Sequence, residues 1–168
     1  IKTIRNKGLD KMIYSKDSST YYPYRVADGI YINKLYPDII YQRILKGPIK
    51  EKKYRYSDLG YYLMMKIIEK QTSEKLADYV GNIYADLGMT TTGYMPRERF
   101  GLDRIPPTED DKIFRKQIIK GDVHDPGSAM LGGVGGHAGV FSNANDLAKL
   151  MQMYLDGGEY GGVRYIKD

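Results

Sequence analysis

The sequence contains no cysteine, no tryptophan and no long apolar run. The lack of cysteine excludes a disulfide framework, a thiol nucleophile and a zinc site built on thiolates. No run of about 18 apolar residues, the length that a membrane span needs, occurs in the chain. A charged segment followed by an apolar one, as in a signal peptide, is also missing from its start. The sequence therefore predicts a globular domain without a transmembrane segment in this chain.

The length of 168 residues suits one domain with its own core. The chain begins at Ile1 rather than at a methionine, and residues 164–168 end it without a turn or helix-capping signal. We therefore expect residues 1–168 to form a single partial domain whose two ends have been cut.

The charge balance is basic, with 26 Lys and Arg against 21 Asp and Glu, a net charge of +5. Such a surface is able to contact nucleic acid or acidic glycans. The basic residues are spread along the chain, however, and glutamates interrupt the clusters at 50–53 and 97–99. This pattern favours an ordinary solvated surface, and we predict no nucleic-acid partner.

Tyrosine is unusually abundant, with 17 residues. Seven fall in the first quarter of the chain: Tyr14, Tyr21, Tyr22, Tyr24, Tyr31, Tyr36 and Tyr41. Their rings either pack a loop-rich segment, which we favour, or line a groove that stacks on sugars or peptides. The second interpretation makes a non-catalytic glycan- or peptide-binding module the alternative to an enzyme.

Helical patterns dominate the rest of the chain. Residues 1–38 are expected to be irregular, apart from one extended piece at 25–32. Helices are predicted over 37–45, from Leu59, and from Ser73 to the terminating Gly88. The helix from Leu59 is apolar on most of its circumference and is expected in the core.

A polar excursion follows over 90–121, with a short helix expected at 113–118. A last helix begins after Ser142 or Asn143 and ends before Gly157. Because almost no strand-like alternation is present, we predict a mainly α fold.

Two segments contain residues suited to chemistry. The glycine-rich run 132–139 lacks the Gly-Lys-Ser/Thr of a phosphate loop. His124 and His137 lie in the same region, and with Asp125 they form a third, weaker hypothesis, a metal-dependent hydrolase. Hydrogen bonding to loop backbone is the favoured role of both histidines, so we predict no metal and no cofactor.

The second segment is Tyr56-Ser57-Asp58, just before the apolar helix from Leu59. The positive end of a helix dipole favours a phenolate, which makes Tyr56 a conceivable general base. Taken alone, the tripeptide is more typical of a capping Ser or Asp beside a packed tyrosine.

Several stretches together resemble class C β-lactamases and the related DD-peptidases and esterases. They are 56–63, 67–70, 76–79, 87–94 and 132–148. With Val123-His124-Asp125, the likeness extends to a branch that includes modules fused to family 3 β-N-acetylglucosaminidases. The resemblance implies the helical subdomain of a β-lactamase/transpeptidase-like α/β fold, truncated at both ends, with a fused glycosidase as a candidate partner.

The resemblance also implies a mechanism in which the serine of a Ser-x-x-Lys motif forms an acyl-enzyme. None of the serines here has lysine three residues later. We therefore expect this motif before Ile1, a Lys-Thr-Gly or His-x-Gly strand after Asp168, and an inactive fragment between them.

By the same resemblance, Tyr56 is the proton shuttle and Asp58 orients the substrate or the absent lysine. Ser57, primarily a helix cap, joins His124 and His137 as a substrate-binding candidate. The family's usual residue at position 58 is Asn, which donates a hydrogen bond, whereas an ionised Asp only accepts. This difference argues against β-lactam turnover and favours another ester or amide. We expect a periplasmic or extracytoplasmic serine hydrolase acting on peptidoglycan-type material.

Overall fold

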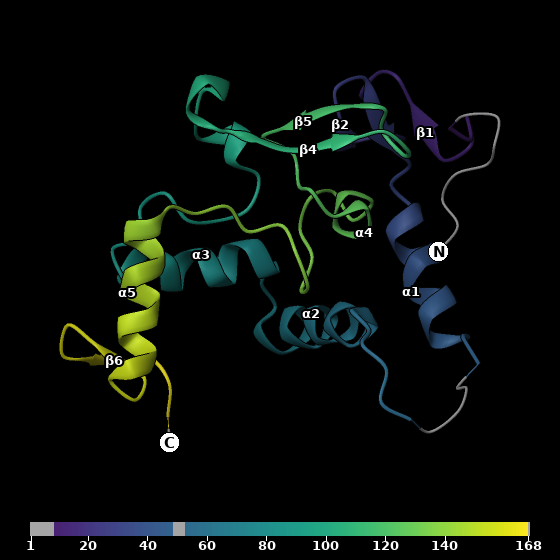
Figure 1. Cartoon of the computed structure of the whole chain (residues 1–168). Helices are drawn as coiled ribbons and strands as arrows, with labels where there is room; N and C mark the ends of the chain where they lie inside the picture. Colours follow the sequence, from purple (N-terminus) through teal and green to yellow (C-terminus); the bar gives the residue numbers. More distant parts are fainter. Residues whose placement is uncertain (1–8, 49–52, 168) are drawn as a thin grey trace.

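The computed structural model describes residues 9–48 and 53–167 (Figure 1). Within them the chain begins with a small antiparallel sheet of three strands, β1 (Tyr14–Ser15), β2 (Tyr24–Ala27) and β3 (Ile30–Ile32), in the order β1-β3-β2. Gly29 makes the turn between β2 and β3 with φ +62°, a left-handed conformation that suits glycine. The extended piece expected at 25–32 is therefore confirmed as a hairpin. Residues 1–8 of the segment expected to be irregular lie outside the described residues.

Three helices follow the sheet. They are α1 (Tyr36–Leu45), α2 (Leu59–Thr72) and α3 (Leu76–Asp86), and they lie in the three predicted helical segments. The predicted start of the third helix was wrong, because Ser73 is the C-cap of α2 with φ +60°. Gly88 adopts φ +68° directly after the C-cap of α3, as the C′ position of a helix requires. The basic cluster at 50–53 lies mostly outside the described residues.

The polar excursion contains a β-hairpin instead of the expected helix at 113–118. After the 3₁₀ turns Pro96–Glu98 and Leu102–Arg104, β4 (Pro107–Asp111) pairs antiparallel with β5 (Gln117–Lys120). Asp111 closes the turn by accepting hydrogen bonds from the backbone amides of residues 113, 114 and 115. The apolar residues that suggested a helical period therefore belong to a turn and a short strand, and the helix prediction was wrong.

The C-terminal third joins a short helix, the glycine-rich segment and a long helix. These are α4 (Pro126–Ala129), residues 132–139 and α5 (Ala144–Leu155), followed by the strand pair β6 (Glu159–Tyr160) and β7 (Val163–Arg164). The Asn143 side chain caps α5 by accepting from the Asp146 amide at 2.9 Å, as the sequence predicted. Asp146 is itself buried and accepts from the amide and hydroxyl of Thr91, which ties α5 to the chain after α3.

Two groups of buried apolar side chains hold these elements together. The smaller joins Leu87, Met89 and Met153, so it packs α5 against the end of α3. The larger lies among the N-terminal sheet, α1, the β4–β5 hairpin and α4, which are neighbours in Figure 1. Its members include Tyr14, Val26, Ile32, Ile40, Phe114, Ile119 and Met130.

The prediction of a mainly α fold was wrong. The described residues contain five helices and seven strands and are 37% helical and 15% strand, which is a mixed α/β composition. The sequence did not predict most of these strands, because they are only two to five residues long. One of them, β4, has the polar sequence Pro-Thr-Glu-Asp-Asp, which carries no alternation of apolar and polar residues.

Helix α2 is less buried than its apolar sequence predicts. Only Tyr62 and Met65 are buried, whereas Leu59, Tyr61, Met64 and Ile67 are exposed. The expectation that this helix lies inside the core is therefore wrong for the four exposed residues. No helix among the described residues combines the length and the apolar character needed to cross a membrane.

Candidate functional site

The residues Tyr56, Ser57 and Asp58 lie directly before the first turn of α2. The Ser57 hydroxyl accepts a hydrogen bond from the Leu59 amide at 3.2 Å, so it satisfies one free donor of the helix start. Asp58 occupies the N-cap position, but its side chain makes no capping hydrogen bond. It instead accepts from the Tyr56 hydroxyl at 2.9 Å.

Tyr56 is 79% exposed and is open to a ligand or to another segment of protein. The hydrogen bond to Asp58, and then the negative charge of that carboxylate, raise the pKa of Tyr56. In this arrangement Tyr56 keeps its proton, in contrast to the phenolate that a helix dipole alone favours. The pair thus presents a phenol that donates and a carboxylate that accepts.

His137 lies in the glycine-rich segment and packs on α2. Its imidazole stacks on the Tyr62 ring, with centroids 4.3 Å apart and planes 15° apart. The His137 Nε2 is 2.8 Å from Oδ1 of Asp125, and the side chain is only 3% exposed. A carboxylate only accepts, so Nε2 carries a proton and Asp125 fixes the orientation of the ring. Nδ1 of His137 is buried without a protein partner among the described residues.

Asp125 joins His137 to α4. Its Oδ1 also accepts from the Ser128 amide at 2.7 Å, which caps this short helix. Burial by itself raises the pKa of Asp125, but the hydrogen bonds from His137 and Ser128 outweigh burial and hold the pKa below its ordinary value. The carboxylate is therefore ionised at neutral pH.

The glycine-rich segment and α4 both lie close against α2. A Cβ added at Gly136 would collide with the backbone oxygen of Tyr61, and one added at Gly127 would collide with the Tyr62 hydroxyl. Burial, and then the charges of Asp125 and Asp58, raise the pKa of Tyr62. The carboxylates of both candidate segments, which lie far apart in the sequence, therefore act on the hydroxyl of Tyr62.

His124 occupies a separate position. Its side chain is 65% exposed, and Nδ1 lies 3.2 Å from Oε2 of Glu109 on β4. The structure therefore pairs His124 and His137 with different carboxylates. Across residues 9–48 and 53–167, no group of three or more His, Asp or Glu side chains is placed to hold a metal ion.

Sequence reasoning missed three residues that position this region. Tyr62 was treated only as a core residue of α2, and nothing in its spacing signals the stacking on His137. Asp125 was considered in the metal-dependent hydrolase hypothesis and in the family resemblance, although Asp before Pro126 is a recognisable helix-start signal. Arg115 was counted as surface charge, but its side chain is fully buried and donates to the carbonyl oxygens of Val123 and His124 at 2.6 Å.

Comparison with known proteins gives a consistent result. The family model described as Beta-lactamase matches residues 11–164. A protein of Escherichia coli (strain K12) named "Putative D-alanyl-D-alanine carboxypeptidase" is 35% identical over 162 residues, covering 82% of this chain and 37% of that protein. A protein of the same name from Salmonella newport (strain SL254) is 36% identical over 143 residues, covering 76% and 33%. The chain thus spans about a third of the length of these curated relatives. No solved structure matches it.

Proposed function

This chain belongs to the β-lactamase family, and on that premise we propose that the polypeptide containing it is a serine hydrolase acting through an acyl-enzyme. Its proposed substrate is an amide or ester of cell-envelope material, of the peptidoglycan type. The names of the relatives, "Putative D-alanyl-D-alanine carboxypeptidase", support this choice. The same relationship supports action in the periplasm or elsewhere outside the cytoplasm.

The observation that carries the proposal is the Tyr56–Asp58 pair at the exposed start of α2. In the proposed reaction a serine oxygen, from a Ser-x-x-Lys segment outside this chain, attacks the carbonyl carbon. The serine proton passes through neighbouring groups to the leaving nitrogen or oxygen, and water then hydrolyses the acyl-enzyme. Tyr56 holds a proton and is exposed, which suits it to deliver that proton to the leaving group.

Asp58 is assigned the role of orienting Tyr56. Its carboxylate accepts the Tyr56 hydroxyl at 2.9 Å, and an ionised carboxylate cannot donate to a substrate carbonyl. The Ser57 hydroxyl oxygen accepts a hydrogen bond from the Leu59 amide. To bind substrate as well, Ser57 would donate its hydroxyl proton to it. The chain itself contains no Ser-x-x-Lys and is proposed to be inactive alone.

His137 and Asp125 are proposed to position the segments beside Tyr56 rather than to react. Their 2.8 Å contact and the stack on Tyr62 fix the glycine-rich segment against the helix that begins after Tyr56. His124 is exposed on the β4 side and is proposed as a contact for the more distant part of a substrate. A fused glycosidase domain stays a prediction from the resemblance.

Labelling with active-site probes tests the proposal. A polypeptide that joins this chain to a Ser-x-x-Lys segment is treated with a fluorescent penicillin and with a fluorophosphonate, beside the 168-residue chain alone. We expect the longer protein to label, the chain alone to remain unlabelled, and Tyr56→Phe to slow labelling by about 10²-fold or more, the size of a lost proton-transfer step.

Tyr54→Phe is the matched control, because Tyr54 is two residues away and is 95% exposed. Its labelling rate should equal that of the parent. If the longer protein labels with neither probe, the hydrolase proposal fails and a glycan- or peptide-binding role becomes the better explanation. Equal rates for Tyr56→Phe and the parent would remove Tyr56 from the mechanism.

A further inference from the structure

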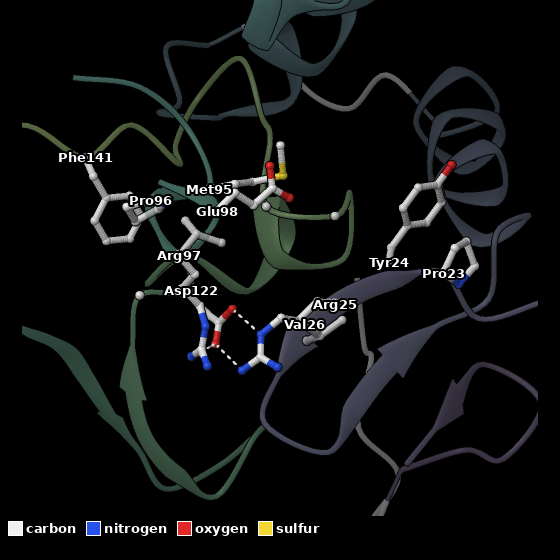
Figure 2. A pocket seen from close by; sticks show the side chains of 14 residues that line it. Pro23, Tyr24, Arg25, Val26, Met95, Pro96, Arg97, Glu98, Asp122 and Phe141 are labelled. Carbon is white, nitrogen blue, oxygen red and sulfur yellow. Dashed lines mark hydrogen bonds and ion pairs between the residues drawn. The ribbon is translucent and has the colours of Figure 1, made fainter. Parts of the chain in front are cut away.

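A cavity lies away from Tyr56, between the N-terminal sheet and the segment that follows α3. It has a volume of about 210 Å³ and is lined by β2, by the 3₁₀ turn at Pro96–Glu98 and by the start of the glycine-rich segment. Figure 2 shows Tyr24 on one side of it and Pro96 with Phe141 on the other. Pockets for drug-sized ligands measure roughly 300–1,000 Å³, so this one suits a smaller group.

The backbone around the cavity is arranged to keep it open. Gly132 and Gly133 have φ angles of +86° and +88°, and a Cβ at Gly132 would meet the Tyr24 ring at 3.3 Å. Met95 lines the same cavity and has φ +46°, a left-handed conformation that a side chain like methionine rarely adopts. Such conformations persist only where the surrounding structure enforces them, and they are found most often at functional sites.

The charges at the base of the cavity cancel each other. Asp122 binds Arg25 through two contacts of 2.8 and 3.0 Å and Arg97 through one of 3.2 Å. Asp28 pairs with the same two arginines, so two positive and two negative charges face each other. Both guanidinium groups are already neutralised, and the base therefore offers little attraction to an anionic ligand.

One charged side chain at the cavity has no partner within residues 9–48 and 53–167. Glu98 lines it, is exposed, and makes no side-chain ion pair or hydrogen bond with any described residue. In Figure 2 its carboxylate lies beside Met95, on the side of the cavity away from the paired arginines. The site therefore combines one free negative charge with apolar and aromatic walls from Met95, Tyr24 and Phe141.

We propose that this cavity binds a primary ammonium group carried on a short apolar chain, as in a lysine side chain. The ammonium would pair with the Glu98 carboxylate, and the apolar chain would pack between Tyr24 and Phe141. The exposed ring of Tyr24 adds a face that attracts cations. This inference does not depend on the hydrolase proposal, because it uses no residue assigned to that reaction.

An NMR titration tests it on the 168-residue chain. The ¹⁵N-labelled chain is titrated with Nα-acetyl-lysine methylamide and, separately, with Nα-acetyl-norleucine methylamide, which has the same shape nearest the backbone but no ammonium. We expect saturable shifts of the amides in 24–26, 97–98 and 132–133, with the lysine compound binding about fivefold more tightly. Added salt should weaken the lysine complex selectively, since the contact is ionic.

Glu98→Gln should weaken binding of the lysine compound about fivefold, the effect of losing one partly solvated ion pair. Glu74→Gln is the matched control, because Glu74 is also exposed and lies outside the cavity. It should bind as the parent does. Equal affinity for the two compounds, an unchanged affinity in Glu98→Gln, or shifts that lie elsewhere would each overturn the proposal.

Discussion

At the scale of single residues, buried hydrogen-bonded charges have the largest predicted effects. The Arg115 side chain is fully buried, and its Nε lies 2.8 Å from Oδ2 of Asp111. Burial alone would raise the pKa of Asp111, but the Arg115 hydrogen bond and three backbone amides outweigh it and lower the pKa to about 2. Asp111 is therefore charged at neutral pH and holds both the hairpin turn and the arginine.

The first prediction concerns this pair. Asp111→Asn removes the nearer counter-charge of the buried guanidinium and leaves Glu109, at 3.3 Å, as its remaining carboxylate partner, and breaking a buried pair typically costs about 3–5 kcal/mol. We expect the free energy of unfolding in urea at pH 7 to fall by about 3 kcal/mol. Asp110→Asn, which alters an exposed carboxylate paired with exposed Lys112, should change it by less than about 1 kcal/mol. Similar losses in both variants would contradict the assigned role.

The same carboxylate predicts an acid dependence. The folded pKa of Asp111 lies below its ordinary value of 3.8, so its stabilisation is present above pH 3.8 and is lost as pH falls toward about 2. The loss should amount to roughly 2 kcal/mol. Urea unfolding between pH 5 and 2 should therefore show a steeper decline in the parent than in Asp111→Asn, and parallel curves would refute the linkage.

Asp125 predicts a graded response. Asp125→Ala removes the α4 cap and leaves the buried Nε2 donor of His137 unsatisfied, so we expect a loss of about 2 kcal/mol in thermal or urea unfolding. Asp125→Asn keeps an oxygen that can accept both hydrogen bonds and should lose clearly less. Equal losses would mean that charge, rather than hydrogen bonding, is what the site needs.

At the scale of elements, the contact between the glycine-rich segment and α2 depends on glycine, which has no side chain to separate the two backbones. Two glycine-to-alanine changes should alter the stability of the fold in opposite directions. Gly136→Ala places a methyl group against the backbone oxygen of Tyr61, which cannot rotate away, and should destabilise by about 3 kcal/mol. Gly81→Ala lies in α3 with no atom within 4 Å of the added methyl, and should stabilise by about 1 kcal/mol. Melting temperatures that shift in the same direction would show that the close approach is not maintained.

The elements themselves were predictable in proportion to their length. Helices α3 and α5 carry repeated apolar spacing and clear end signals, so their C-terminal ends agree closely with the sequence, whereas α3 begins at Leu76 and not at the predicted Ser73. The β4–β5 hairpin was missed because hydrogen bonds to Asp111 and the burial of Arg115 stabilise it, and these contacts join residues whose order shows no period. Neither could the stack of His137 on Tyr62 be foreseen, because it joins residues 75 positions apart.

At the scale of the whole molecule, apolar side chains of α2 remain on the surface. Tyr61, Met64 and Ile67 are each more than half exposed, with Leu59 nearby at 45%. A row of such residues on one helix commonly marks a surface that packs against other protein. The chain spans about a third of the length of the curated relatives that it matches, so the remainder of the proposed hydrolase is a natural candidate to cover this helix.

For the isolated chain, we predict concentration-dependent self-association through α2. Sedimentation should show the parent associating as its concentration rises, and Met64→Lys combined with Ile67→Lys should keep it monomeric without lowering its melting temperature. Leu45→Lys is the control, because Leu45 is 65% exposed but lies on α1. If Leu45→Lys disperses the chain equally well, added charge rather than the α2 surface is responsible.

The burial of Arg115 also has a consequence for proteolysis. Trypsin must take an arginine or lysine side chain into its own specificity pocket, and the Arg115 guanidinium is held inside the protein by Asp111 and by the carbonyl oxygens of Val123 and His124. Lys112, three residues earlier, has a side chain that is 77% exposed. Limited digestion of the folded chain should therefore cut this turn after Lys112 and spare the bond after Arg115. Cleavage after Arg115 would report opening of the hairpin.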